Sequence, residues 1–142
     1  MAVKYLIVFL AACSAHVQTV QLVNRTPRAI EEVYIYPTGA VDHGKSRLTL
    51  APNASASVQV PQGNIEVMAV SAKMQLDSHT RDRPSANVDV ELKAPAEVVF
   101  YDEGQKPAEV GRPGVFGCSF QLPKSNMPGT VPVEVVGPPK SE

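Results

Sequence analysis

The sequence predicts an all-β fold, an antiparallel β-sandwich of Greek-key type (Ig-like or transthyretin-like) with about nine short strands. Three observations support this prediction. Apolar and polar residues alternate with a period of two in many short segments. Turn-forming Pro, Gly and Asn residues recur about every 8–12 residues. Beyond the N-terminal segment, no stretch has the apolar periodicity of an amphipathic helix. We therefore expect two sheets that pack face to face, with no substantial helix after the signal segment.

In the first half of the chain, most of the predicted strands are followed by turn-forming residues. The strand at 30–36 would place Val33 and Ile35 on one face and Tyr34 and Tyr36 on the other. Pro37 lacks a backbone N–H and would end that strand. The predicted strands of this half are 16–23, 30–36, 47–50, 57–60 and 65–71.

The second half contains the clearest alternation, at 87–93. Val88, Val90 and Leu92 would face the core, while the polar residues between them face solvent. The predicted strands of this half are 73–77, 87–93, 96–101, 115–122 and 131–136. Residues 17–127 would form the sandwich. Residues 128–142, rich in Pro and Gly, would form an extended, partly disordered tail.

The N-terminal segment has the pattern of an export signal. Lys4 precedes an apolar run over residues 5–12, which ends in small residues. As a helix this run would be only about 12 Å long, much shorter than the ~30 Å hydrocarbon core of a bilayer. A basic residue, then an apolar run, then small residues predict a secretory signal and not a membrane span.

The end of this signal, Leu10-Ala11-Ala12-Cys13, resembles the lipobox of bacterial lipoprotein precursors. The resemblance implies that residues 1–12 are removed and that Cys13 carries a diacylglyceryl group and an N-acyl chain such as palmitate. Residues 13–16 would then form a short tether to the bilayer. Because Ser14 stands where an Asp often retains such proteins in the inner membrane, we expect the outer membrane, facing the periplasm. The alternative is an ordinary signal cleaved after Ala15.

Charge and motifs exclude several functions. Lys and Arg total 13 against 14 Asp and Glu, so no basic excess favours nucleic acid. The segment from Gly39 to Ser46 matches the phosphate-binding P-loop pattern. A P-loop must open a helix, whose N-terminal amides bind phosphate. Pro52 would break such a helix within two turns, so we expect no nucleotide binding.

No candidate metal or catalytic group has the spacing that its chemistry needs. The potential metal ligands are Asp42, His43, His79, Asp82 and Cys118, with Met68, Met74 and Met127 as further candidates for copper. They lack the short, regular spacing of a metal motif, so we expect no metal and no cofactor. Cys118 lies in an apolar strand, where a buried, unreactive thiol is expected.

The most charged loop offers the best candidate surface for a partner. It contains His79, Arg81, Asp82 and Arg83 and is long for a sandwich loop. A solvated loop with internal Asp–Arg pairs is the simpler alternative. We therefore expect a non-catalytic envelope lipoprotein that binds or scaffolds another envelope protein. The alternative is a periplasmic lipoprotein that binds a metal or a small ligand. We do not expect an enzyme.

Overall fold

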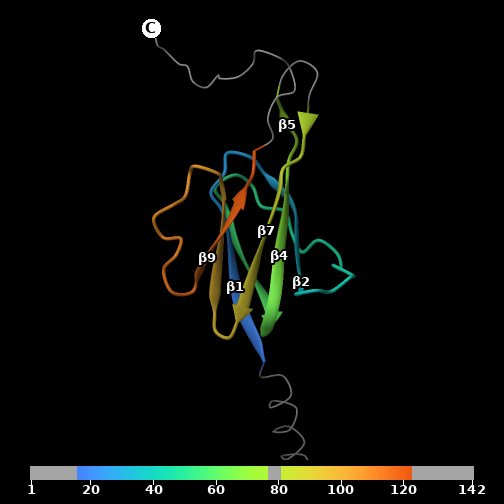
Figure 1. Cartoon of the computed structure of the whole chain (residues 1–142), viewed down its shortest axis with the longest axis vertical. Coiled ribbons are helices and arrows are strands. Elements are labelled where there is room, and N and C mark those ends of the chain that lie inside the picture. The colour runs from blue at the N-terminus through green and yellow to red at the C-terminus, as the bar shows by residue number, and fades with distance from the viewer. Residues whose placement is uncertain (1–15, 77–80, 123–142) are drawn as a thin grey trace, which may run out of the picture.

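The computed structural model describes residues 16–76 and 81–122, and these residues form two packed sheets and a small hairpin (Figure 1). Every regular element among them is a strand, which confirms the predicted all-β sandwich. The strands are β1 (Val17–Asn24), β2 (Ile30–Pro37), β3 (Ser55–Pro61), β4 (Gly63–Ser71), β5 (Met74–Gln75), β6 (Arg81–Asp82), β7 (Ser85–Leu92), β8 (Ala96–Asp102) and β9 (Val115–Phe120). No helix long and apolar enough to cross a membrane occurs within these two ranges.

The larger sheet is mixed, which corrects the expectation of purely antiparallel pairing. Its strand order is β3-β1-β8-β9, and the smaller sheet has the order β2-β4-β7. β1 pairs antiparallel with β3 but parallel with β8, and β8 pairs parallel with β9. Parallel neighbours need a crossover connection. Residues 103–114 provide one, because they return the chain to the end of the sheet where β8 began.

Two predicted strands differ locally from the structure. Residues 47–50 lie beside β2 but form no strand, since their regular pairing is limited to one bridge between Leu50 and Ile30. Arg47 N also donates a 2.7 Å hydrogen bond to the Val33 carbonyl. This bond does not fall on every second residue counted from the Ile30–Leu50 bridge, as a regular antiparallel ladder requires. The strand expected at 73–77 is the two-residue β5, paired with β6. The strand expected at 131–136 lies outside the described residues.

The core lies between the two inner faces and follows the predicted alternation. In β8, Val98 and Phe100 point inward, and Val33 and Ile35 do so in β2. The buried cluster comprises Val20, Leu22, Ile30, Val33, Ile35, Leu50, Val60, Ile65, Val67, Ala69, Ala86, Val90, Leu92, Val98, Phe100, Cys118 and Phe120.

A second layer covers the outer face of β8 and β9. Val99, which points away from the main core, is nevertheless fully buried. Val110, from the 103–114 crossover, packs over this face at Gly117, where an added Cβ would lie 2.6 Å from Val110 Cγ1. Glycine at position 117 therefore allows the crossover to approach the sheet closely, because any larger residue would collide with it.

Strand registers define two ends of the sandwich. The proximal end, where the described chain begins, contains Val17, Pro37, Pro61, Gly63 and Leu92. The distal end contains Asn24, Ile30, Ser71, Ser85 and Phe120. In Figure 1 the proximal end is at the bottom, and the β5 hairpin extends beyond the distal end at the top.

Candidate functional site

The distal end is closed by an ion pair between Arg28 and Asp102. Arg28 Nη1 and Nη2 donate to Asp102 Oδ2 and Oδ1 at 2.9 and 2.7 Å. Arg28 Nε donates to Ser71 Oγ at 2.8 Å, and the guanidinium lies 5.7 Å from the ring centroid of Phe120. The two charged side chains are only 13% and 11% exposed. This bidentate pair joins the β1–β2 turn to the end of β8 and therefore has a structural role.

The same turn is fixed by a buried asparagine. Asn24 Nδ2 donates to the carbonyls of Arg28 at 2.8 Å and Ala51 at 3.1 Å, while Asn24 Oδ1 accepts from Thr26 N at 2.9 Å. Asn24 and Thr26 are both almost fully buried. Because an Asn side chain can bond to the backbone two residues later, the sequence Asn-Arg-Thr-Pro already carried the signal for this turn. The Arg28–Asp102 pair carries no such local signal, because the two residues are 74 positions apart in the chain.

The predicted partner surface lies beyond the distal end, on β6 and the residue that follows it. Arg81 and Asp82 are exposed. Arg81 Nε donates to Gln75 Oε1 across the hairpin at 2.6 Å, and Asp82 Oδ1 accepts from Arg83 N at 2.8 Å. His79 lies outside the described residues. The Asp82 carboxylate thus bonds to a backbone amide, and no ion pair between Asp82 and an arginine side chain occurs among the described residues.

The Arg83 side chain is partly exposed and contacts two glutamates of β2. Its Nη2 lies 2.6 Å from Glu31 Oε1 and 3.4 Å from Glu32 Oε2. Glu32 also accepts a 2.6 Å hydrogen bond from the Tyr34 hydroxyl. This bond, more than the positive charge of Arg83, lowers the pKa of Glu32, and it raises the pKa of Tyr34. Arg83 thus ties the base of the hairpin to the smaller sheet.

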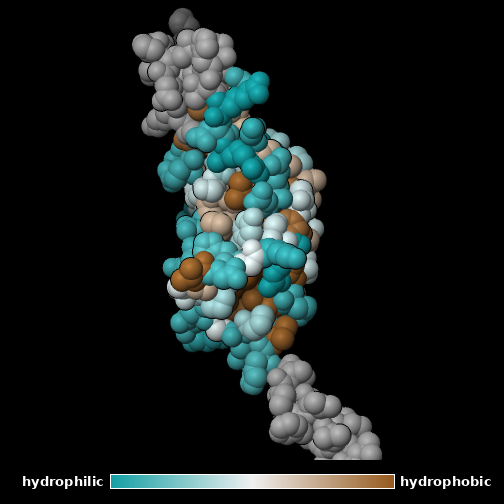
Figure 2. Space-filling view, turned by 90° about the vertical axis from the view of Figure 1, so that its right-hand side faces the viewer, coloured by the Kyte–Doolittle hydropathy of each residue, from teal (hydrophilic) through white to brown (hydrophobic). Residues whose placement is uncertain are grey.

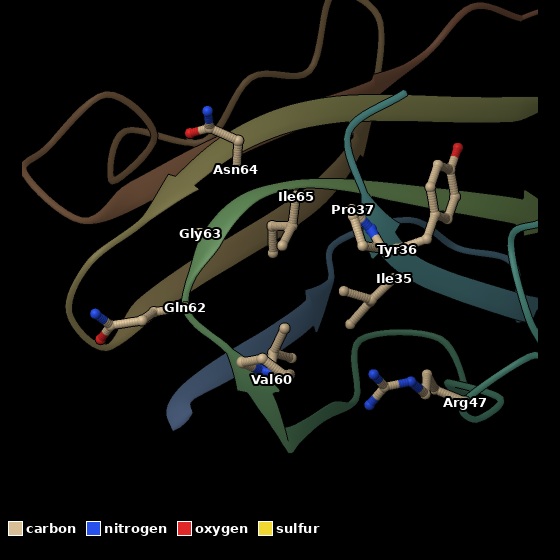
Figure 3. A pocket seen from close by; sticks show the side chains of 10 residues that line it. Ile35, Tyr36, Pro37, Arg47, Val60, Gln62, Gly63, Asn64 and Ile65 are labelled. Atoms are coloured by element: carbon tan, nitrogen blue, oxygen red, sulfur yellow. The ribbon is translucent and has the colours of Figure 1, made fainter. Parts of the chain in front are cut away.

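An apolar cavity of about 410 Å³ opens at the proximal end. Figure 3 shows Ile35, Val60 and Ile65 converging from β2, β3 and β4, while Arg47 lies at one side. The cavity rim includes Gln62, whose N–H donates to the His16 carbonyl at 2.7 Å. The chain therefore enters the sandwich beside the cavity. No local sequence pattern predicts this cavity, because its walls come from three separate segments.

The P-loop-like segment projects beside this cavity and opens no helix. Gly44 N donates a 2.9 Å hydrogen bond to the Asp42 carboxylate. In a P-loop, an amide at this position would instead donate to a phosphate. Ser46 Oγ accepts from Val33 N at 3.1 Å. The ring of His43 stacks on Tyr36 with centroids 3.9 Å apart. This arrangement differs from a nucleotide cradle, and the absence of nucleotide binding remains a prediction.

On the side of β2, the surface alternates between apolar and hydrophilic side chains (Figure 2). Figure 2 shows small apolar patches separated by hydrophilic side chains, and several of these patches lie toward the proximal end. The exposed large apolar side chains of the described residues include Val17, which is 46% exposed, and Val41, which is 98% exposed. Both belong to segments at or near the proximal end.

The potential metal ligands that the structure describes do not form a cluster. His43 lies against Tyr36 on the outer side of β2, Asp82 lies in the distal hairpin, and Cys118 is fully buried. Groups of three or more His, Cys, Asp or Glu that could hold a metal do not occur among the described residues. His79 and Met127 lie outside them. Burial raises the pKa of Cys118 to about 12, so its thiol remains protonated and weakly nucleophilic at neutral pH.

Comparisons of the chain with protein-family models, with curated proteins and with solved structures gave no match.

Proposed function

We propose that this chain is a non-catalytic lipoprotein of the bacterial envelope that is anchored through Cys13 and binds another envelope protein. The observation that carries this proposal is the arrangement of the two ends. Cys13 lies three residues before His16, a distance of at most about 10 Å along the chain. The His16 carbonyl accepts a hydrogen bond from the backbone N–H of Gln62 at the proximal end. An anchor on Cys13 therefore holds the proximal end at the bilayer.

The distal end then faces away from the membrane. β1 has eight residues and is about 26 Å long, so the distal hairpin stands well clear of the lipid surface. Arg81 and Asp82 present charge of both signs there. Arg is frequent at protein–protein interfaces, and a polar exposed rim is common in them. These features support a partner surface formed by the predicted residues His79, Arg81, Asp82 and Arg83.

The location follows from the lipobox resemblance and from Ser14. We propose the outer membrane with the domain in the periplasm. A diacylglyceryl group and an N-acyl chain together give stable anchoring, whereas a single acyl chain would be marginal. The protonated, buried Cys118 supports a non-catalytic role, because the described cysteine is not activated.

The test combines palmitate labelling with site-specific photocrosslinking of the full chain in a Gram-negative bacterium. A photoreactive amino acid at Arg81 should crosslink one envelope protein of defined mass. The same group at Lys93, exposed at the proximal end, serves as the matched control and should not crosslink that protein. The wild type should incorporate labelled palmitate, and Cys13→Ser should not.

Each arm can fail separately. Equal palmitate labelling of the wild type and Cys13→Ser would contradict the anchor. Crosslinking of the same protein from Lys93 and Arg81 would contradict a distal partner surface, and so would a lack of any crosslink from Arg81.

A further inference from the structure

The outer edge of β3 carries backbone groups that pair with no other described strand. β3 is the end strand of the larger sheet and pairs with β1 alone among the described strands. Two hydrogen bonds, from Asn24 N to the Ala54 carbonyl and from Gln62 N to the His16 carbonyl, show which residues of β3 bond to β1. Since antiparallel bonds alternate, the even-numbered residues of β3 point their N–H and C=O groups toward β1. Ser57 and Gln59 therefore point theirs away from the sheet.

Apart from Pro61 at its proximal end, this edge has none of the usual protection within the described residues. Natural edge strands are commonly blocked by charged side chains, bulges or proline. Residues 55–60 contain no charged residue, and the β1–β3 register runs without a shift from Val23 to Val17. Proline occurs at the proximal end of the strand, as Pro61. β2, the corresponding edge of the smaller sheet, has a register shift after Ile30 and is covered by residues 46–50.

The apolar cavity lies where this edge reaches the proximal end. Val60 belongs to β3 and points into the cavity together with Ile35 (Figure 3). In a strand added along β3, the residue opposite Val60 would point to the same side of the sheet as Val60. Its side chain would thus be directed toward the cavity.

The charged side chain that lines the cavity is positive. The Arg47 side chain lies at the cavity wall and has no ion-pair partner within 16–76 and 81–122. Lys45, two residues away in the chain, is also exposed. A carboxylate in the added strand would complement this charge, whereas a basic residue would be repelled.

A second copy of this chain fits the site poorly. Antiparallel pairing of two β3 edges about Ser57, Val58 or Gln59 would place Ala54, Ala56 or Val58 opposite Val60. These side chains are short and would leave most of the 410 Å³ cavity unfilled. The occupant must therefore bring a longer apolar side chain.

We propose that the β3 edge binds an extended segment of another protein as an added antiparallel strand. A large apolar side chain of that segment enters the cavity beside Val60, and an acidic side chain two residues later faces Arg47. The backbone supplies hydrogen bonds to Ser57 and Gln59, and the cavity selects the side chain. The proposal needs neither the lipid on Cys13 nor the distal surface, so it can fail or hold independently of the proposed function.

The probe is a fluorescein-labelled peptide, Thr-Phe-Thr-Asp-Thr-Val-Thr, titrated with the purified full-length chain and followed by fluorescence anisotropy. The peptide should bind, and replacing its Phe by Ala should weaken binding about tenfold or more, because the cavity would lose its occupant. N-methylation of the second and third Thr removes the amides that face β3 and should abolish binding. N-methylation of Asp and Val, whose amides face away, should have little effect.

The matched protein variants are Ser57→Pro and Ser57→Ala. Proline removes the outward N–H of residue 57 but leaves the ladder to β1 intact, because the N–H of Ser57 does not bond to β1. Ser57→Pro should weaken binding about tenfold, whereas Ser57→Ala should bind like the wild type. Circular dichroism establishes that both variants are folded. Should Ser57→Pro fail to fold, the two N-methylated peptides still decide the question.

Several results would overturn the proposal. One is no binding of the peptide at about 1 mM protein, and another is equal binding of the two N-methylated peptides. A dimer in analytical ultracentrifugation that Ser57→Pro dissociates would assign the edge to a second copy. Tighter peptide binding after deletion of residues 123–142 would assign it to this chain's own C-terminal segment.

Discussion

The two ends of the sandwich differ in how the space between the sheets is closed. At the distal end, Arg28, Asp102 and Asn24 fill the space with polar groups whose hydrogen bonds are satisfied within the domain. At the proximal end, Ile35 and Val60 face an open apolar cavity. A satisfied buried network fixes structure, whereas an unfilled apolar cavity lowers the cost of accepting another side chain.

Because the two ends are closed differently, we expect the distal end to contribute mainly to stability and the proximal end mainly to binding. Polar residues at the distal end are held by partners in distant segments, since Arg28 and Asp102 are 74 residues apart. At the proximal end the comparable bonds, from Gln18 to Gln62 and to the Lys93 carbonyl, are exposed to solvent, and the cavity borders the edge of β3. We therefore expect substitutions at the distal end to affect mainly the free energy of unfolding. Substitutions at the proximal end should affect binding more than folding.

The largest effect is expected for Asp102→Ala. This change leaves the guanidinium of Arg28 mostly buried without its carboxylate, and breaking such a pair should cost about 3 kcal/mol of unfolding free energy. Urea denaturation of the two proteins measures the loss. Glu109→Ala is the control, because it breaks the more exposed Arg25–Glu109 pair and should cost at most about 1 kcal/mol. Equal losses in the two variants would show that the distal network has no special structural role.

A smaller difference in unfolding free energy is expected between alanine substitutions of two valines, Val67 and Val60. Val67 is fully buried in the middle of β4, and Val67→Ala should cost about 2 kcal/mol because it opens a new void. Val60 already borders the cavity, so Val60→Ala removes fewer contacts and should cost about 1 kcal/mol. Equilibrium unfolding of both variants gives the comparison. A greater loss for Val60→Ala would mean that the cavity is closed in solution.

The third effect, which develops only in alkaline solution, concerns Cys118 in the closed part of the core. Its native pKa of about 12 lies above the value near 8.5 expected in the unfolded chain. The unfolded chain therefore loses its thiol proton first, and this group's contribution to stability is complete below pH 8.5. It declines by roughly 2 kcal/mol between pH 8 and pH 10. Urea midpoints at the two pH values measure the decline.

Cys118→Ala serves as the control for that measurement, because it cannot titrate at this position. Its stability should fall less over the same pH interval than that of the wild type. Identical pH dependence in the two proteins would contradict the expected burial of the thiol. So would rapid alkylation of native Cys118 by iodoacetamide at pH 8.

Local pattern predicted much of this fold because the β period is a local property. The alternation of Val33, Ile35 and Tyr34 gave the faces of β2 correctly, and Pro37 marks its last residue. The buried state of Cys118 likewise followed from its apolar neighbours. The charged segment around Arg81 was expected to be a loop. Arg81 and Asp82 are exposed, but they form the short strand β6, which pairs with β5.

Features that join distant segments could not be predicted in this way. The parallel pairing of β8 with β1 and β9 depends on where the 103–114 crossover returns, and alternation within a strand is the same for either direction. The close packing of Val110 on Gly117 depends on the same crossover. The cavity at Val60 likewise exists only after β2, β3 and β4 have met.

By itself the sequence determined the all-β class, the main strands and their buried faces, because steric preference and hydrophobic periodicity act within a few residues. It also supplied the lipobox resemblance at Cys13, which is a local motif. Tertiary structure alone decided the mixed sheet, the Arg28–Asp102 pair, the open edge at Ser57 and the cavity beside it. Each of these depends on which distant segments become neighbours, and that is set by packing of the whole domain.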